Sequence, residues 1–455
     1  METIDSVVRL LSNFVWGIPM QILLVGTGLF LTFYLRGLQF SKIFYAIKIL
    51  FDKESQSKGD ISQFSALMLS LGATVGIGSI VGVATAISIA GPGAVFWMWV
   101  TGLVGMATKY SEGILAVKYR EKGAFGYNGG PMYYIKNGLN MPKLAMAFAI
   151  FTIIASIGTG NMTQSNAVSS ILSEQANLPS WVSGLLLTLL TAVIVIGGIK
   201  SIGKFTSYLA PIMVLLYLIA IIYIIVSHFD LAIQAIKLIF EEAFNPKPVV
   251  GGASGALVAT MIKTGVARGL YSNEAGLGSS AIIAASAQTH HPVRQALVSM
   301  LQTFIVTLIV CSATASVILM APEYNTLLPN GEKLSANLLT LKSTEYFLGS
   351  LGTVVIFTTM IFFAYSTIIG WAYYGEKCTE YAFGEKKVKY YRLIFLASVM
   401  VGAMAKIDFV WNLADLSNGL MAIPNLIALI LLHKVVSSET RWYFSKHSNK
   451  CKTAC

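Results

Sequence analysis

The sequence has few charged side chains. Asp, Glu, Lys and Arg together make up 12% of its 455 residues, about half of the roughly 25% that is usual in soluble proteins. Hydrophobic residues make up 55% and come in long blocks, so the surface of this chain would not stay soluble. These features exclude a soluble enzyme with one buried core and predict an all-α polytopic membrane protein.

Several motifs are also missing. The four cysteines form no CxxC pair and no disulfide framework. The N-terminus lacks a basic segment followed by a cleavage site, so we expect no removable signal peptide. No HExxH, GxSxG or P-loop motif occurs, and we therefore do not expect an enzyme. The net charge of +11 comes from cations in short connections, which we interpret as topology signals and not as a nucleic-acid surface.

Eleven apolar stretches approach the ~20 residues that a helix needs to cross a bilayer. They occupy residues 16–36, 62–88, 92–118, 144–173, 181–198, 206–228, 252–287, 294–320, 347–376, 391–407 and 411–434. Most Lys and Arg residues fall on one side of this alternating arrangement, which predicts an outside N-terminus and a cytoplasmic C-terminus. We expect one plasma-membrane domain in the lipid bilayer, functional as a monomer, with a basic tail at 435–455.

Two of these stretches are interrupted by glycines. The second contains SLGATVGIGSIVG at 70–82, and the seventh contains TGVARGLYSNEAGLGSS at 264–280. Close helix packing is one explanation for such glycines. Their positions favour another, because after an extra helix at 16–36 they open two groups of five spans, 62–228 and 252–434, that cross the membrane in opposite directions. Inverted repeats of this kind are typical of secondary transporters.

The two interruptions predict a binding site between residues 74–79 and 272–278. Unwound backbone at this depth survives only where it faces protein, water or a ligand. The N-terminal end of a half-helix offers N–H groups to a carboxylate, and the C-terminal end of the other half offers carbonyls to a small cation. An amino acid and Na+ meet both requirements.

Polar side chains within the spans are further candidates for this site. Thr74, Ser79 and Gln164 lie in apolar stretches, although a hydroxyl in a helix usually bonds back to its own i−4 carbonyl. The neighbouring hydroxyls of Ser366 and Thr367 either bond back in this way or complete the oxygen coordination of a hard cation. Both alternatives stay open at this point.

Charged residues inside a membrane are functional candidates by default. The seventh span carries Lys263, Arg268 and Glu274, and the last two lie on either side of the expected break. A pair between them, or with another helix, would gate the site, and a purely structural ion pair is the alternative. Asp415, near the start of the last span, is placed to face the outer vestibule. Trp371 lies one helical turn from Thr367 and so shares its face.

From about residue 60 to 434 the sequence resembles the alanine or glycine:cation symporter family, also called sodium:alanine symporters. The motifs that carry this resemblance are GATVGIGSIVGVATAI, GPGAVFWMW, GTGNMTQSNAV, GLYSNEAGLGSS, HPVRQALVSM, FAYSTIIGWAYYGE and LMAIPNLIALILL. The resemblance implies a fold similar to that of neurotransmitter sodium symporters, with two inverted five-helix repeats and an extra helix. It also implies inward movement of a small neutral amino acid together with Na+.

The resemblance further implies roles for individual residues. The substrate carboxylate would meet the backbone at Ile77 and Gly78. The opposite wall would be the unwound Ser272–Gly276 region, and Gln164 and Trp371 would also contact the amino acid. The residues implied on the wall and around Na+ are Ser272, Asn273 and Gly276, the carbonyls of Gly72, Val75 and Phe363, and the hydroxyls of Ser366 and Thr367.

Ser79 stands where many members of that family have Asn, so its role toward cation or substrate is open. The shorter side chain leaves more room, and glutamine and other neutral amino acids therefore remain alternatives to alanine and glycine. Coupling to H+, with Glu274 or Asp415 as the carrier, is the alternative to Na+.

Overall fold

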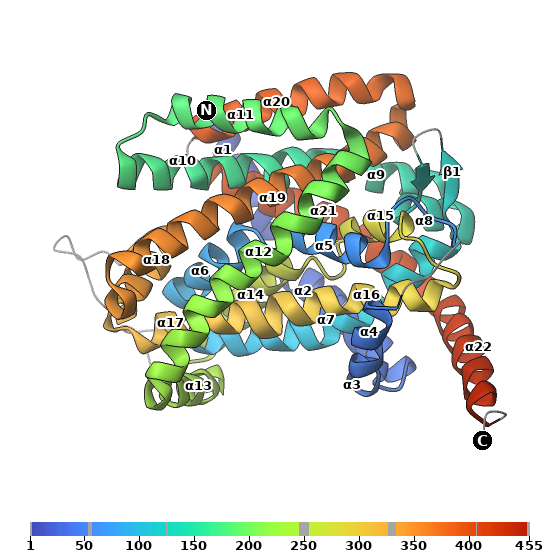
Figure 1. Cartoon of the computed structure of the whole chain (residues 1–455), viewed down its shortest axis with the longest axis horizontal. Helices are drawn as coiled ribbons and strands as arrows, with labels where there is room; N and C mark the ends of the chain where they lie inside the picture. Colours follow the sequence, from blue (N-terminus) through green and yellow to red (C-terminus); the bar gives the residue numbers. More distant parts are fainter. Residues whose placement is uncertain are drawn as a thin grey trace.

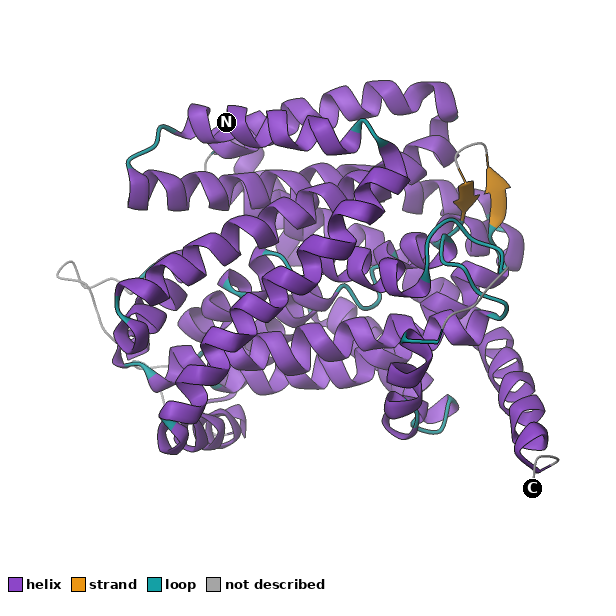
Figure 2. Ribbon diagram, in the orientation of Figure 1, coloured by secondary structure: helices purple, strands orange, loops and turns teal. Residues whose placement is uncertain are grey.

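The computed structural model describes residues 2–52, 57–123, 126–244, 254–325, 334–405 and 407–452. Within these ranges the chain is almost entirely helical, and one short hairpin is the exception to the expected all-α structure (Figure 2). Long helices lie side by side across the molecule, and the C-terminal helix projects away from them (Figure 1).

Helices occupy each of the expected membrane stretches. Helix α1 (Glu2–Val15) precedes the first stretch. The helices within the stretches are α2 (Ile18–Tyr34), α5 (Gln63–Thr74), α6 (Val81–Ala90), α7 (Gly93–Lys118), α9 (Pro142–Ile157), α10 (Thr163–Ala176), α11 (Ser180–Val195), α12 (Gly198–Ser227), α14 (Ser254–Asn273), α15 (Ser279–Ala285), α16 (Pro292–Thr303), α17 (Ser312–Met320), α19 (Ser350–Phe383), α20 (Val388–Met404) and α21 (Ile407–Leu431). The connecting helices are α3 (Leu38–Ser41), α4 (Ile43–Leu50), α8 (Pro131–Leu139), α13 (Phe229–Phe244), α18 (Ala336–Leu348) and α22 (His433–Lys452).

Five helical stretches in the described ranges are long and apolar enough to cross a membrane, and six are if α1 and α2, bent by 42°, form one span. The five are Pro142–Ala176, Ser201–Ser227, Pro292–Met320, Ser350–Phe383 and Val410–Leu431. The helices in the other expected stretches are interrupted, shorter or more polar. The count of eleven crossings and the two repeats, 62–228 and 252–434, therefore stay predictions.

A few of the expected positions lie outside the described residues. These are 252 and 253 in the seventh stretch, 406 in the tenth, and 453–455 in the basic tail. The described part of that tail is helical and belongs to α22.

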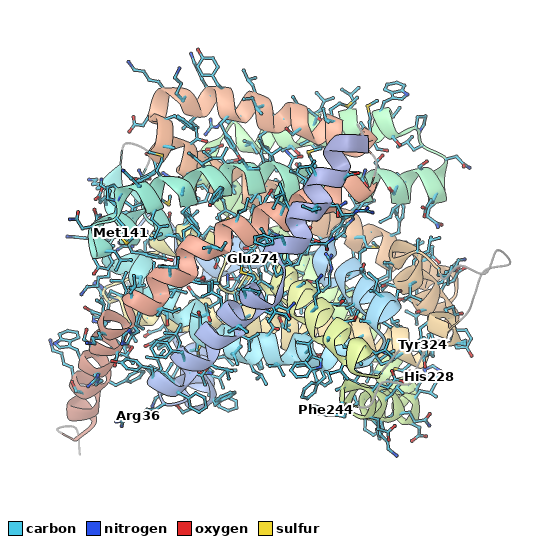
Figure 3. All side chains as sticks on the ribbon, turned by 180° about the vertical axis from the view of Figure 1, so that it is seen from behind. Arg36, Met141, His228, Phe244, Glu274 and Tyr324 are labelled. Atoms are coloured by element: carbon cyan, nitrogen blue, oxygen red, sulfur yellow. The ribbon has the colours of Figure 1, made fainter. Side chains whose placement is uncertain are left out.

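The outer helices present large apolar side chains to the surroundings. On α11 and α12 the exposed ones include Val193, Ile212, Ile219 and Val226. A soluble protein rarely exposes apolar surface on this scale, whereas a bilayer solvates it. Many polar side chains are buried in the interior, and Glu274 lies near the centre of the molecule (Figure 3).

The hairpin joins β1 (Glu121–Gly123) to β2 (Gly126–Asn128) in the connection after α7. Nearby, a single parallel bridge joins Ile61, just before α5, to Ala287, just after α15. The Arg120 guanidinium donates to the carbonyls of Ala285 (2.9 Å) and Ala287 (2.7 Å) and so reinforces this bridge. The start of α5 and the end of α15 are thus joined on one side of the molecule.

Candidate functional site

The first interrupted helix breaks where the glycines predict. Helix α5 ends at Thr74, a 3-10 turn covers Ile77–Ser79, and α6 begins at Val81. The N–H of Gly76 donates to the carbonyl of Thr74 at 2.8 Å, not to Gly72 as a continuous helix would require. The Gly72 carbonyl is therefore available to another partner.

The second break begins later than expected. Helix α14 continues through Ser272 and Asn273, so the prediction that unwinding starts at Ser272 is wrong. The Ser272 hydroxyl donates to the Gly269 carbonyl at 2.9 Å, and the Asn273 side-chain oxygen accepts from the N–H of Ala275 at 2.9 Å. Glu274 is the first residue in the left-handed region, with φ of 56°, and the irregular segment ends where α15 begins at Ser279.

Three of the residues expected around Na+, Gly72, Ser366 and Thr367, come together between the first break and α19. The Thr367 hydroxyl donates to the Gly72 carbonyl at 3.3 Å. A Cβ on Gly72 would lie 2.5 Å from Ser366 Oγ, and a Cβ on Gly76 would lie 2.5 Å from Thr367 Oγ1. Only glycine at these two positions allows the backbone to approach both hydroxyls so closely.

This cluster fits a hard cation. Ser366 is fully buried, and its hydroxyl has no hydrogen-bond partner among the described residues. Val75 and Phe363, whose carbonyls complete the expected set, are also fully buried. A buried hydroxyl without a partner costs about 1–3 kcal/mol, and coordination of a small cation by carbonyl and hydroxyl oxygens would remove that cost. The back-bonding alternative is not adopted by Ser366 or Thr367.

Gln164 faces the first break from α10. Its side-chain oxygen accepts from the N–H of Ile77 at 3.2 Å, and its amide nitrogen donates to the carbonyl of Thr159 at 3.2 Å. A π-helical turn, Gly158–Met162, directly precedes α10, and such turns often mark functional sites. A side chain at Gly160 in this turn would overlap Trp371, so the glycine lets Trp371 reach the same region.

Other expected residues surround this region to different degrees. Gly78 lies against the ring of Tyr271, since a Cβ there would be 2.6 Å from Tyr271 Cδ1. Ser79 is fully buried, and its hydroxyl has no partner among the described residues. The Thr74 hydroxyl instead donates back to the Ser70 carbonyl at 2.7 Å, as the helix-internal alternative predicts.

The charges of the seventh span separate into three situations. Arg268 donates to Asp415 of α21, with Nη2 to Oδ2 at 2.9 Å, and its guanidinium lies 5.2 Å from the centre of the Trp411 ring. Glu274 accepts from Trp371 Nε1 at 3.0 Å. Arg268 and Glu274 therefore do not pair with each other, and that alternative is wrong. Arg268 pairs instead with Asp415 of another helix. Lys263 is exposed and does not line the site.

Sequence reasoning missed a buried network on α7. Glu112 Oε1 accepts from the N–H groups of Gly276 (3.0 Å) and Gly278 (3.1 Å) and from Asn425 Nδ2 (2.8 Å). Lys109 Nζ lies 3.9 Å from Glu112 Oε2. Lys109, near the expected cytoplasmic end of the 92–118 stretch, is fully buried. Two opposite charges three residues apart inside the 92–118 stretch were the signal that could have revealed this network.

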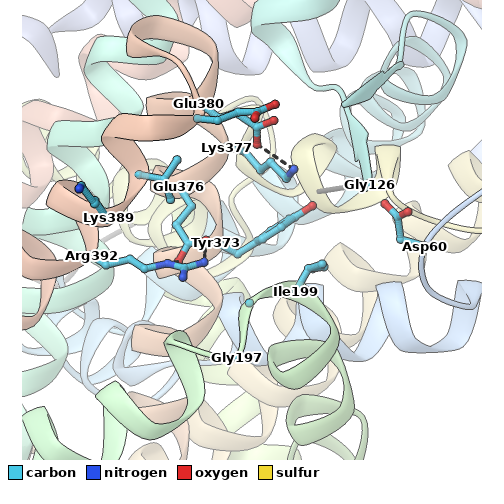
Figure 4. A pocket seen from close by; sticks show the side chains of 13 residues that line it. Asp60, Gly126, Gly197, Ile199, Tyr373, Glu376, Lys377, Glu380, Lys389 and Arg392 are labelled. Atoms are coloured by element: carbon cyan, nitrogen blue, oxygen red, sulfur yellow. Dashed lines mark hydrogen bonds and ion pairs between the residues drawn. The ribbon is translucent and has the colours of Figure 1, made fainter. Parts of the chain in front are cut away.

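A cavity of ≈ 570 Å³ opens near the C-terminal end of α19 (Figure 4). Arg392 pairs there with Glu376, with Nε to Oε1 at 2.7 Å, and Lys377 pairs with Glu380 at 3.0 Å. Tyr373, two residues beyond Trp371, lines the same cavity. The site residues themselves are closed off, since Gln164 and Trp371 are each only 1% exposed.

Comparisons with known proteins agree with this architecture. A family model described as the sodium:alanine symporter family matches residues 1–454. The chain is 45% identical to the sodium/alanine symporter AgcS of Methanococcus maripaludis, covering 99% of both chains. It is 35% identical to the probable sodium/glutamine symporter GlnT of Bacillus subtilis, covering 97% of this chain and 91% of that one. Among solved structures, a Na+-coupled sialic acid symporter is similar in fold, with a TM-score of 0.52, 12% identity, and coverage of 87% and 82%.

Proposed function

Since the chain belongs to the sodium:alanine symporter family, we propose that it is a secondary active transporter that carries a small neutral amino acid, alanine or glycine, into the cell together with Na+. It acts as a monomer in the plasma membrane, with its N-terminus outside and its C-terminus in the cytoplasm. Alternating access moves the site between the two sides.

The orientation of the substrate follows from the two breaks. The N–H groups of Gly276 and Gly278 in the second break are already held by the Glu112 carboxylate. The N–H of Ile77 in the first break is held by the neutral amide oxygen of Gln164, which a substrate carboxylate can replace with a stronger, charge-assisted bond. This difference carries the proposal that the amino acid places its carboxylate at Ile77 and Gly78.

The substrate side chain then faces a narrow space. The Tyr271 ring lies against Gly78. Trp371 of α19 and Gln164 of α10 bound the same proposed substrate space, which we call the chamber. Ser272 and Asn273, on the opposite wall, belong to helix α14. The Ser272 hydroxyl donates to the carbonyl of Gly269, and the Asn273 amide donates to the hydroxyl of Thr307. A chamber of this kind favours small side chains, which supports alanine and glycine over glutamine.

The coupling of Na+ binding to amino acid binding follows from one backbone segment that both would contact. The oxygens proposed for Na+, at Gly72 and Val75, and the N–H group proposed for the substrate, at Ile77, belong to one unwound segment. Binding of Na+ orders this segment and raises the affinity for the amino acid. By linkage, the amino acid raises the affinity for Na+ by the same factor.

Gln164 and Trp371 are each only 1% exposed, so the proposed site would be closed to solvent in this conformation. The pair of Arg268 and Asp415 joins α14, just before the second break, to the first half of α21, and both positions lie on the side of the break that is expected to face outward. The bridge between Ile61 and Ala287 lies toward the expected cytoplasmic side, near the cavity of Figure 4. Opening one closure at a time would give alternating access.

Uptake by purified protein in liposomes tests the proposal. We expect radiolabelled alanine and glycine to accumulate when Na+ is present outside and not when choline replaces it. Glutamine uptake exceeding alanine uptake would favour the glutamine alternative, for which the relative GlnT is the supporting observation. Accumulation driven by a pH gradient in Na+-free buffer would favour H+ coupling instead.

A further inference from the structure

Among the described residues around the second break, two buried carboxylates share one buried cation. Glu112 and Glu274 are 1% and 2% exposed, and Lys109 is fully buried. Among the described residues Lys109 forms its ion pair with Glu112, and no cation pairs with Glu274. Glu112 Oε2, which faces Lys109, receives no hydrogen bond from any described residue. The cluster as a whole therefore lacks positive charge.

Hydrogen bonds decide which carboxylate carries the fixed charge. Glu112 Oε1 accepts from three N–H donors, those of Gly276, Gly278 and Asn425. Three donors on one oxygen, with the Lys109 ammonium beside the other, stabilise the ionised form. The fixed negative charge is therefore assigned to Glu112, which pairs with Lys109.

Glu274 has only neutral partners. Its Oε1 accepts from Trp371 Nε1 at 3.0 Å, and its Oε2 bonds with the Ser279 hydroxyl. A hydroxyl donates most strongly to an ionised carboxylate, and it can also accept from a carboxylic acid. Glu274 can therefore gain or lose a proton while it keeps both contacts.

The missing charge matches the Na+ of the proposed function. The ligands proposed for Na+ are carbonyls and hydroxyls, so the ion brings an uncompensated positive charge into the interior. Trp371, the partner of Glu274, lies one helical turn beyond Thr367 on α19. With Na+ bound, an ionised Glu274 leaves the interior neutral. Without Na+, the same carboxylate would be an unpaired buried charge, which costs several kcal/mol.

We propose that Glu274 is a proton-binding site of the sodium-free transporter, so that Na+ and this proton exclude each other. When Na+ leaves, Glu274 takes a proton from water and becomes a neutral acid. When Na+ binds, the proton returns to water. This inference rests on the proposed Na+ coupling, and it differs from H+ symport because the proton opposes Na+ instead of replacing it as the driving ion.

The other titratable groups around Glu274 do not account for such an effect. They are Lys109 and Glu112 on α7, Tyr271 on α14 and Tyr374 on α19. Lys109 and Glu112 pair with each other at 3.9 Å, and tyrosine hydroxyls ordinarily titrate near pH 10. Glu274, whose two hydrogen-bond partners are neutral, is thus the group that we expect to change its charge.

Binding of radioactive Na+ to the purified full-length protein, measured from about pH 5 to about pH 8, tests the inference. In the wild type, the Na+ concentration for half-saturation should rise as the pH falls, by up to about tenfold per pH unit where Glu274 titrates. Glu274→Gln mimics the protonated form, so it should bind Na+ weakly and with no pH dependence. Glu345→Gln, which alters an exposed carboxylate paired with Lys342, should behave like the wild type.

Two results would overturn the inference: a flat wild-type profile, or an unchanged pH dependence in Glu274→Gln. Should Glu274→Gln fail to fold, Ser279→Ala serves instead. It removes a hydrogen bond that favours the ionised carboxylate, so its pH dependence should shift to higher pH, and an unshifted profile would contradict the inference. A wild type that binds no Na+ at any pH contradicts the proposed function itself, whereas Na+ binding without pH dependence contradicts only the proton site.

Discussion

The side-chain oxygen of Gln164 accepts a hydrogen bond from the backbone N–H of Ile77 at 3.2 Å. The amide thus bonds to the N–H group that we assign to the substrate carboxylate. Because Gln164 is neutral, it can give up this bond to a carboxylate or stay beside it as a second polar contact. A substitution of Gln164 therefore tests where the amino acid binds.

Gln164→Glu should weaken alanine binding strongly. A second carboxylate about 4 Å from that of the substrate repels it by about 4 kcal/mol at an effective dielectric constant of about 20, so we expect a loss of at least about tenfold in affinity. Titration calorimetry at saturating Na+ measures this loss. Gln234→Glu on the exposed surface of α13 is the matched control and should bind alanine as the wild type does. Equal affinities of the two variants would remove Gln164 from the substrate site.

Ser366→Ala and Thr367→Ala should each raise the Na+ concentration needed for half-maximal alanine uptake. Each variant removes one oxygen from the proposed coordination shell, and we expect a shift of about tenfold, corresponding to about 1.4 kcal/mol. Ser398→Ala on α20 removes a hydroxyl that donates to the carbonyl of Ile394 and should cause no shift. Unchanged Na+ dependence in both test variants would exclude these hydroxyls as ligands.

The two breaks were predictable because glycine leaves a visible signal. Gly72, Gly76 and Gly78 interrupt an apolar stretch at a cost in helix stability, and the structure uses them for close approaches to Ser366, Thr367 and Tyr271. The exact start of the second break was not predictable in this way. Ser272 and Asn273 are tolerated in a helix end because their side chains bond to nearby backbone groups.

The charges of Lys109 and Glu112 on α7 are visible in the sequence, but the partners of Glu112 could not be predicted from it. Glu112 meets Gly276, Gly278 and Asn425, which lie more than 150 residues away along the chain. A span with a Lys and a Glu near its end also looks like an ordinary cytoplasmic boundary. Only the tertiary arrangement shows that Lys109 is buried, so the contacts of these charges depend on packing and not on a local pattern.

Gly78→Val should abolish alanine uptake. The Cβ that any side chain adds at this position would lie 2.6 Å from Cδ1 of the Tyr271 ring, so the larger residue must displace the ring or fill the chamber. Gly82→Ala provides the control in the same interrupted span, since nothing lies within 4 Å of the Cβ it adds. Liposome uptake of alanine measures both variants. Normal transport by Gly78→Val would contradict the proposed position of the chamber beside Gly78.

Lys109→Met should destabilise the protein more than any substitution of an exposed lysine. It leaves the Glu112 carboxylate in the interior without its paired cation, and breaking a buried pair in this way costs about 3–5 kcal/mol. The double variant Lys109→Met, Glu112→Gln removes both members of the pair and should recover part of the loss, because glutamine still offers an oxygen to the N–H groups of Gly276 and Gly278. Thermal unfolding of the detergent-solubilised protein measures the three midpoints. Lys342→Met, which breaks an exposed pair with Glu345, should change stability by about 0–1 kcal/mol. A double variant that is less stable than Lys109→Met alone would mean that Glu112 holds the second break through its charge, independently of Lys109.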